Sequence, residues 1–245
     1  MCEEKGKDFL EDAVLYPDNP NNRTGHFSKY AISDKALHAQ EYGLLAYFNT
    51  FSMNNGECYI SRKKILKDLN ISRAVYDPAL AALKDQGYIT TKRCIRNSRR
   101  VYAFILTEPE KSKSLPTKVK EKDPDYPKSG LDRFGYADIT QNLMRSPTLR
   151  FGAKCVYVYL AAKMGKSQQV KLPMEQMRRD LDMSEATINK YTTELIRYNL
   201  INKSRIRKAG KYCSVLYYLP GAVLEEANRP EKTTVIIENL PSAFH

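Results

Sequence analysis

The stretch Ser184-Glu185-Ala186-Thr187-Ile188-Asn189-Lys190-Tyr191-Thr192-Thr193-Glu194-Leu195 decides the fold class expected for this chain. Ser184 is of a type that begins helices, because its hydroxyl can accept a hydrogen bond from a free backbone N–H of the first turn. Ile188 and Leu195 follow Ser184 by four and eleven residues, so both lie on one face of that helix. The stretch therefore predicts an amphipathic helix whose opposite face is polar.

A second helix is predicted directly upstream of this one. Pro173 is typical of a first helical residue, and Met177 and Leu181 continue an apolar face at helical spacing. Asp182-Met183 leaves room only for a tight turn between the two helices. Residues 173–195 are therefore expected to form a helix-turn-helix pair.

The same pattern occurs a second time, 112 residues earlier. Leu37–Ile89 aligns without a gap onto Leu149–Ile201, with eight identities in 53 positions. The identical pairs are Leu37/Leu149, Tyr47/Tyr159, Asp68/Asp180, Leu69/Leu181, Ser72/Ser184, Ala74/Ala186, Leu83/Leu195 and Ile89/Ile201. Each copy is expected to hold two helices, a tight turn, a third helix and a short strand that enters a hairpin.

The first copy has its own helix signals and one departure. Gly43–Phe51 predicts a buried first helix, and Ile60–Leu69 predicts a second helix capped by Ser61. Pro78, however, cannot donate a backbone N–H and would clash one turn back inside a helix. Asp77-Pro78 forms a good N-cap followed by a first helical residue, so the third helix of this copy is expected to begin about five residues late.

A basic hairpin is predicted after each copy, with tips at Asn97-Ser98 and Ala209-Gly210. Each hairpin holds five positive residues and no acidic residue within nine positions. The positive residues are Lys92, Arg93, Arg96, Arg99 and Arg100 in the first hairpin, and Lys203, Arg205, Arg207, Lys208 and Lys211 in the second. Charges this close repel one another unless an anion is near, which predicts phosphate contact; a merely soluble hairpin is the alternative.

The formal charge of +12 is concentrated in the two copies. Residues 27–106 hold 13 Lys and Arg against 6 Asp and Glu, and residues 134–219 hold 15 against 6. We therefore expect two basic domains over 27–106 and 134–219, with a mobile N-terminal arm over 1–26. Pro-rich, charged residues 107–133 predict a solvated linker. Residues 220–245 are expected to form a C-terminal tail, and the pattern as a whole favours polyanion binding.

The chain carries no pattern typical of an enzyme. Its three histidines and five cysteines are scattered without metal-ligand spacing, so no catalytic residues, metal or cofactor are expected. Seventeen tyrosines could indicate stacking on single-stranded nucleic acid. The apolar setting of four of them favours core packing instead; these are Tyr42, Tyr47, Tyr157 and Tyr159. The absence of a signal peptide and of an apolar run long enough to span a membrane predicts a cytoplasmic protein.

The residues quoted above resemble a known family. The capping serine, the spaced Ile and Leu and the closing Asn199-Leu200-Ile201 are similar to the second half of a winged helix-turn-helix domain. The first copy keeps this frame in Ser72, Tyr76, Leu83 and Gly87-Tyr88-Ile89. The resemblance implies a mainly α fold with small β-hairpins (α+β), as two tandem winged-helix domains joined by a flexible linker.

Such domains place the capped helix in the major groove of DNA, with its N-terminal residues at base edges. Carried over by position, the resemblance implies base contacts from Glu185, Ala186, Asn189, Lys190 and Thr193, with Arg73 from the first copy. An ordinary solvated helix face is the alternative. The remaining equivalents in the first copy suit base reading less well, so that copy is expected to be the weaker reader; they are Ala74, Asp77, Pro78 and Ala81.

The second copy, including Phe134-Gly135-Tyr136 and residues 143–160, resembles helix-turn-helix proteins of Gram-positive plasmids, phages and integrated elements. Many of these are replication initiators or regulators. The resemblance implies a monomer or homodimer that binds double-stranded DNA in replication initiation or transcription control. The alternative is a protein-interaction module that docks a replisome or conjugation partner through residues 27–106 or the tail.

Overall fold

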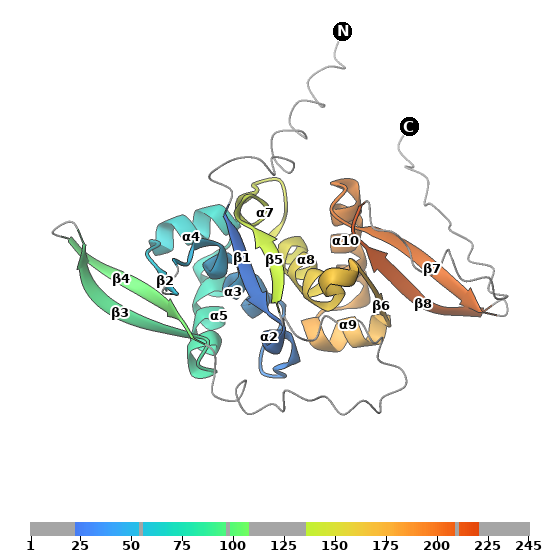
Figure 1. Cartoon of the computed structure of the whole chain (residues 1–245), viewed down its shortest axis with the longest axis horizontal. Coiled ribbons are helices and arrows are strands. Elements are labelled where there is room, and N and C mark those ends of the chain that lie inside the picture. The colour runs from blue at the N-terminus through green and yellow to red at the C-terminus, as the bar shows by residue number, and fades with distance from the viewer. Residues whose placement is uncertain (1–22, 54–55, 97–98, 108–135, 209–210, 221–245) are drawn as a thin grey trace, which may run out of the picture.

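The computed structural model describes residues 23–53, 56–96, 99–107, 136–208 and 211–220, which form two successive series of elements (Figure 1). The first series is β1 (Thr24–Ser28), α2 (Lys29–Ser33), α3 (Ala39–Phe51), β2 (Glu57–Cys58), α4 (Arg62–Leu69), α5 (Arg73–Asp85), β3 (Ile89–Arg96) and β4 (Arg99–Leu106). The second is β5 (Tyr136–Thr140), α7 (Gln141–Arg145), α8 (Phe151–Met164), the 3-10 turn η1 (Gly165–Ser167), β6 (Gln169–Leu172), α9 (Met174–Leu181), α10 (Glu185–Arg197), β7 (Asn202–Lys208) and β8 (Lys211–Tyr218).

The two series repeat at the spacing of the sequence repeat. The pairs β1/β5, α2/α7, α3/α8, α4/α9 and α5/α10 each begin 112 residues apart. The structural repeat therefore starts at Thr24, well before the sequence alignment. The boundary predicted between residues 26 and 27 falls inside β1. This strand was not predicted, because its partner strand lies far away in sequence and no local pattern indicates the pairing. Residues 1–22 of the predicted arm, 108–133 of the linker and 221–245 of the tail lie outside the described residues.

Ser61 and Ser184 cap α4 and α10, as the sequence predicts. The Ser61 Oγ accepts a hydrogen bond from the Lys64 N–H at 3.3 Å, and the Ser184 Oγ accepts one from the Thr187 N–H at 3.2 Å. Pro173 lies one position earlier than predicted. It is the extended N-cap residue of α9 (ψ 140°), and its carbonyl accepts the first N–H groups of that helix.

The expectation of a late start for α5 is wrong. The helix begins at Arg73 and continues through Pro78, with the Tyr76 N–H 3.1 Å from the Ser72 oxygen. Tyr76, in the first turn, is 1% exposed. Burying a large apolar side chain stabilises a fold by about 1.5–3 kcal/mol, which is comparable with the roughly 3 kcal/mol cost of an interior proline. Starting the helix after Pro78 would lose that burial.

Three small antiparallel sheets accompany the helices. Each half has its own three-stranded sheet, in the orders β2-β4-β3 and β6-β8-β7. The third sheet consists of β1 and β5 alone and therefore joins the two halves. The coarse class, helices with small antiparallel hairpins, is as expected from the sequence.

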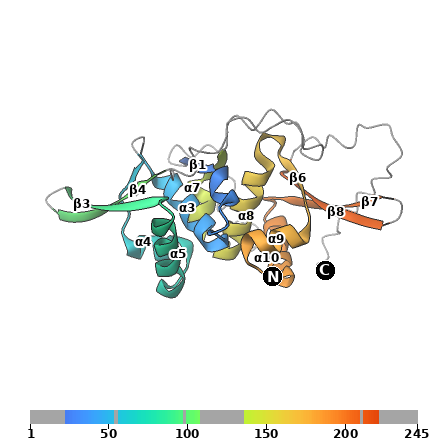
Figure 2. The ribbon, with the colours of Figure 1, turned by 90° about the horizontal axis from the view of Figure 1, so that it is seen from below.

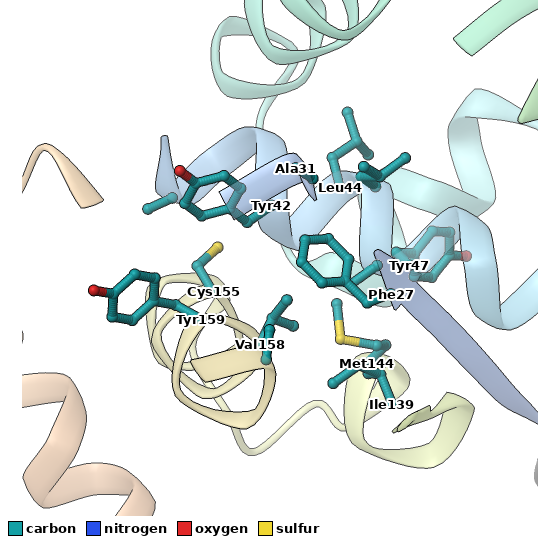
Figure 3. Packing of buried hydrophobic residues seen from close by; sticks show 14 of the residues in the cluster. Phe27, Ala31, Tyr42, Leu44, Tyr47, Ile139, Met144, Cys155, Val158 and Tyr159 are labelled. Atoms are coloured by element: carbon teal, nitrogen blue, oxygen red, sulfur yellow. The ribbon is translucent and has the colours of Figure 1, made fainter. Parts of the chain in front are cut away.

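The two halves, which the sequence predicts as two domains joined by a linker, share one hydrophobic core. A single cluster of buried side chains includes Phe27 and Tyr42 from the first half and Ile139, Cys155 and Tyr159 from the second (Figure 3). Helices α3 and α8 are its centre, and Figure 1 places β1 and β5 over them. The halves converge because most residues of both helices are apolar and buried, and the first half alone or the second half alone covers only part of that surface.

Equivalent residues meet where the halves join. In the register of β1 with β5, His26 pairs with Asp138, its counterpart 112 residues on, and their side chains lie 2.7 Å apart. In the core, a Cβ built on Gly43 would lie 2.5 Å from the Sγ of Cys155, again its counterpart. Residues that face their own equivalents mark an approximate twofold axis. The chain therefore folds as an internal pseudodimer.

Lys154 is a fully buried cation at this junction. Its Nζ donates to the Met144 carbonyl at 2.8 Å and to the Asp68 carbonyl, in the other half, at 3.2 Å. Burial lowers the pKa of Lys154 to about 8. At the equivalent position, the Tyr42 hydroxyl lies 3.4 Å from the Ile32 carbonyl, which is the counterpart of Met144. The approximate symmetry therefore extends to individual hydrogen bonds.

Candidate nucleic-acid interface

Each half contains two helices joined by a turn in the left-handed region. Asn70 ends α4 with φ 53° and ψ 51°, and Asp182 ends α9 with φ 50° and ψ 50°. Such residues reverse the chain at a helix C-terminus at low cost, because Asn and Asp tolerate this conformation better than most residues. The next N–H groups, of Ile71 and Met183, bond back to the preceding helix at 3.1 and 3.2 Å. The turns predicted at both places are confirmed.

A matched pair of hydrogen bonds fixes α4 and α9 against the central helices. The Tyr47 hydroxyl donates to Asp68 at 2.9 Å, and the Tyr159 hydroxyl donates to Asp180 at 2.7 Å. Burial first, and then the adjacent carboxylate, raise the pKa of both tyrosines. Four residues that are identical between the sequence copies therefore hold the scaffold. Tyr42, Tyr47 and Tyr159 are buried and Tyr157 is half-buried, which confirms their predicted place in the core.

Cations compensate both carboxylates at the edge of the core. Asp68 lies 3.2 Å from the Lys64 Nζ and 3.5 Å from the Arg145 Nε. Asp180 lies 3.3 Å from the Lys163 Nζ. Arg145 belongs to the second half, so the ion pair that it forms with Asp68 crosses between halves. These basic residues support the orientation of the helix pairs.

The predicted base-contact residues of α10 share one face of the helix. Glu185, Ala186, Lys190 and Thr193 are exposed, and Asn189 is half-buried. The opposite face carries the buried residues Ile188, Thr192 and Leu195. The sequence pattern therefore identified both faces of α10 correctly.

Asn189 is held by the hairpin that follows α10. Its Oδ1 accepts a hydrogen bond from the Lys203 Nζ at 3.2 Å, and the same ammonium lies 5.9 Å from the Tyr217 ring centroid. Lys203 had been predicted to contact phosphate. In the structure it links β7 to the exposed face of α10, a contact that depends on how the hairpin packs and has no local sequence signal.

The exposed face of α5 differs from that of α10. Arg73, the residue predicted to contact bases, is exposed at the start of the helix. Asp77 lies 4.0 Å from the Arg62 guanidinium of α4. The rest of this face is small and apolar, and comprises Ala74, Pro78 and Ala81. The exposed face of α5 therefore presents small apolar groups and the Arg73 guanidinium as its strong hydrogen-bond donor. The exposed face of α10 presents the amide, ammonium and hydroxyl groups of Asn189, Lys190 and Thr193.

Two long hairpins extend from opposite ends of the molecule (Figure 1). β3 pairs with β4 up to Arg96 opposite Arg99, and β7 pairs with β8 up to Lys208 opposite Lys211. The predicted tips, residues 97–98 and 209–210, lie outside the described residues, as do the side chains of Arg96, Arg99, Arg100, Arg205, Arg207, Lys208 and Lys211. The backbone register nevertheless puts these basic positions on the outer parts of the hairpins.

The first hairpin carries two exposed large hydrophobic side chains that were not predicted from the sequence. Ile95 is 77% exposed and Tyr102 is 56% exposed. Arg93 lies opposite Tyr102 in the register, donates to its hydroxyl at 3.1 Å and has its guanidinium 5.6 Å from the ring centroid. Alternation places Arg93 and Ile95 on the same side of β3. That alternation was visible in the sequence, whereas the pairing with Tyr102 required the hairpin register.

The helix pairs are on one side of the molecule. Figure 2 shows α5 and α10 along the same edge, on either side of α3 and α8, with the hairpins pointing outward. Among the described residues, no group of three or more His, Cys, Asp or Glu side chains could hold a metal ion. In the same part of the chain, no helix is long and apolar enough to cross a membrane.

Comparisons of the sequence with protein-family models and with curated proteins found no match.

Proposed function

We propose that the protein is a non-catalytic double-stranded DNA-binding protein built from two winged helix-turn-helix units. Helix α10 is the main base reader, through Asn189, Lys190 and Thr193, and the two hairpins contact phosphates. The observation that carries the proposal is the presence of two helix-turn-helix pairs on one side of the molecule, each followed by a basic hairpin. Helices with exposed polar faces and hairpins with clustered cations suit the major groove and the phosphate backbone, respectively.

The charge distribution supports a polyanionic partner. Both halves are strongly basic by sequence, and five positive residues crowd each hairpin. Phosphate neutralisation releases counterions, so affinity for DNA should fall steeply with salt. The resemblance of the second half to proteins of plasmids, phages and mobile elements favours a role in replication initiation or transcription control.

The test is equilibrium binding to labelled duplex DNA from the region that flanks the gene, at several salt concentrations. We expect affinity well above the non-specific level, which is typically about 10⁻⁴–10⁻⁶ M in Kd at physiological salt. The triple variant Arg205→Glu, Arg207→Glu and Lys208→Glu should lose binding, and the matched triple variant to Gln should be intermediate. If the wild type binds every duplex only at the non-specific level, the proposal of sequence recognition is wrong.

A second candidate is a protein-interaction module for a replisome or conjugation partner. The exposed Ile95 and Tyr102 side chains of the first hairpin are suited to a protein surface. The Glu triple variant separates the two functions. Lost DNA binding with retained activity in cells would favour the protein partner, whereas loss of both favours DNA.

A further inference from the structure

The junction between the halves restricts how they are related in space. β1 and β5 are equivalent strands, and they pair antiparallel. A simple translation of one half onto the other would leave equivalent strands parallel. Antiparallel pairing, with His26 opposite its own counterpart Asp138, requires a rotation of about half a turn. The facing of Gly43 and Cys155 in the core places the same axis between α3 and α8.

This rotation reverses one helix-turn-helix pair relative to the other. Because α5 and α10 lie along one side of the molecule (Figure 2), the axis runs between them toward that side. A duplex bound on that side would be read by the two helices in opposite directions along its strands. Twofold proteins bind inverted half-sites for this reason, with centres about 10–10.5 bp apart or a multiple of that distance.

The two readers are nevertheless unlike. Of the five equivalent positions on their exposed faces, only Ala74 and Ala186 are the same residue type. The α10 face carries Asn189 and Lys190, which suit adenine and guanine edges, whereas Arg73 and the alanines of α5 suit a guanine and thymine methyl groups. A symmetric homodimer binds two identical half-sites, because its two recognition helices are identical. The two recognition helices of this pseudodimer differ, so its half-sites need not be identical.

The halves also form one rigid unit. The shared core, the β1–β5 pairing and the bonds from the Lys154 Nζ to carbonyls of both halves leave no hinge between the readers in the described part of the chain. The spacing that the protein accepts between half-sites is therefore fixed.

The geometry points to a DNA target made of two unlike half-sites in inverted orientation, at one fixed spacing, bound by a single copy of this chain. This inference rests on the proposed DNA-binding function and goes beyond it.

The test begins with selection of binding sites by the full chain from duplexes with a randomised region. We expect an enriched inverted pair with unlike halves, bound by one chain as measured by sedimentation of the complex. Direct repeats, or a palindrome bound by two chains, would overturn the inference while leaving the DNA-binding function intact. Absence of any enriched sequence would overturn the proposed sequence-specific function and the inference with it.

Two further measurements use the selected site. Insertion of half a helical turn between the half-sites should reduce affinity to that of an isolated half-site; unchanged affinity would contradict a rigid twofold reader. Lys190→Ala should relax base preference in one half only, and Arg73→Ala in the other half only, each by roughly tenfold at the contacted position. Both residues are exposed, so the folds of the variants should be unaffected, and circular dichroism checks this. Relaxation of both halves by either variant would contradict the assignment.

Discussion

Gly43 of α3 and Cys155 of α8 are equivalent residues that face each other across the junction of the two halves, so closely that a Cβ on Gly43 would lie 2.5 Å from the Cys155 Sγ. The ring of Phe151 lies next nearest, at 2.9 Å. Cys155 is fully buried and has little freedom to move. Glycine is therefore required here for close helix approach, although it weakens the helix itself.

Gly43→Ala should lower the free energy of unfolding by about 1–3 kcal/mol, because overpacking a dense core costs that much. The improved helix propensity of Ala, about 1 kcal/mol, offsets part of this loss. Urea denaturation provides the measurement, with Gln40→Ala on the exposed side of α3 as the control. The double variant Gly43→Ala/Cys155→Ala should recover most of the loss. A stabilised single variant would contradict the close approach.

Lys154 should give the fold a recognisable pH dependence. Its pKa is about 8 in the folded chain, lowered by burial from an unfolded value of 10.5. Between these values the unfolded chain binds more protons, so this group makes stability rise with pH from about 8 to about 10.5. Below pH 8 the full penalty, about 3 kcal/mol, is present. Buried Cys58 and Cys155 act in the opposite direction in the alkaline range, because burial raises their pKa values.

The contribution of Lys154 is isolated by comparing the wild type with Lys154→Met at each pH. The difference in unfolding free energy between the two proteins should shift in favour of the wild type as pH rises from 8 to 10, since the cysteines are common to both. Chemical denaturation at several pH values provides the measurement. A pH-independent difference would mean that the Lys154 ammonium has an ordinary pKa.

Helices α4, α9 and α10 and the turns at Asn70 and Asp182 were predictable from the sequence because their signals are local. Ser61 and Ser184 each cap a helix by a hydrogen bond to a backbone N–H three residues further along the chain. Asn70 and Asp182 form the turns because their residue types tolerate the left-handed backbone conformation. The faces of α10 follow from helical spacing alone. The candidate base-contact residues of α10 therefore share the polar face that the sequence predicts, with Asn189 half-buried and the other four exposed.

The junction of the halves was not predictable in the same way. The pairing of β1 with β5 joins residues 112 apart in sequence at positions such as His26 and Asp138, and no local pattern carries that information. Lys203 likewise looked like a phosphate ligand, and its bond to Asn189 depends on how β7 packs beside α10. At Pro78 a local rule failed, since α5 runs through the proline and the burial of Tyr76 offsets much of its cost.

Pro78 and Lys190 occupy the same position of equivalent helices, so exchanging their residue types tests the cost of proline directly. Both side chains are exposed. Pro78→Lys should raise the free energy of unfolding by about 1–3 kcal/mol, because it restores a backbone donor inside α5. Lys190→Pro should lower it by about 3 kcal/mol. Thermal unfolding of both variants measures the effect. Destabilisation by Pro78→Lys would show that α5 is adapted to the proline.

The first hairpin should contact DNA through both charge and apolar surface. Arg93→Ala should reduce affinity and reduce the slope of log K against log salt by about 0.9, the value for one phosphate contact on duplex DNA. Ile95→Ala should reduce affinity with no change in that slope, because Ile95 carries no charge and is 77% exposed in the free protein. The control is Lys35→Ala, which removes an equal charge in the loop between α2 and α3. Equal slopes for Arg93→Ala and the wild type would show that Arg93 does not contact a phosphate. If Ile95→Ala affects only the binding of a protein partner, this face of the hairpin binds protein and not DNA.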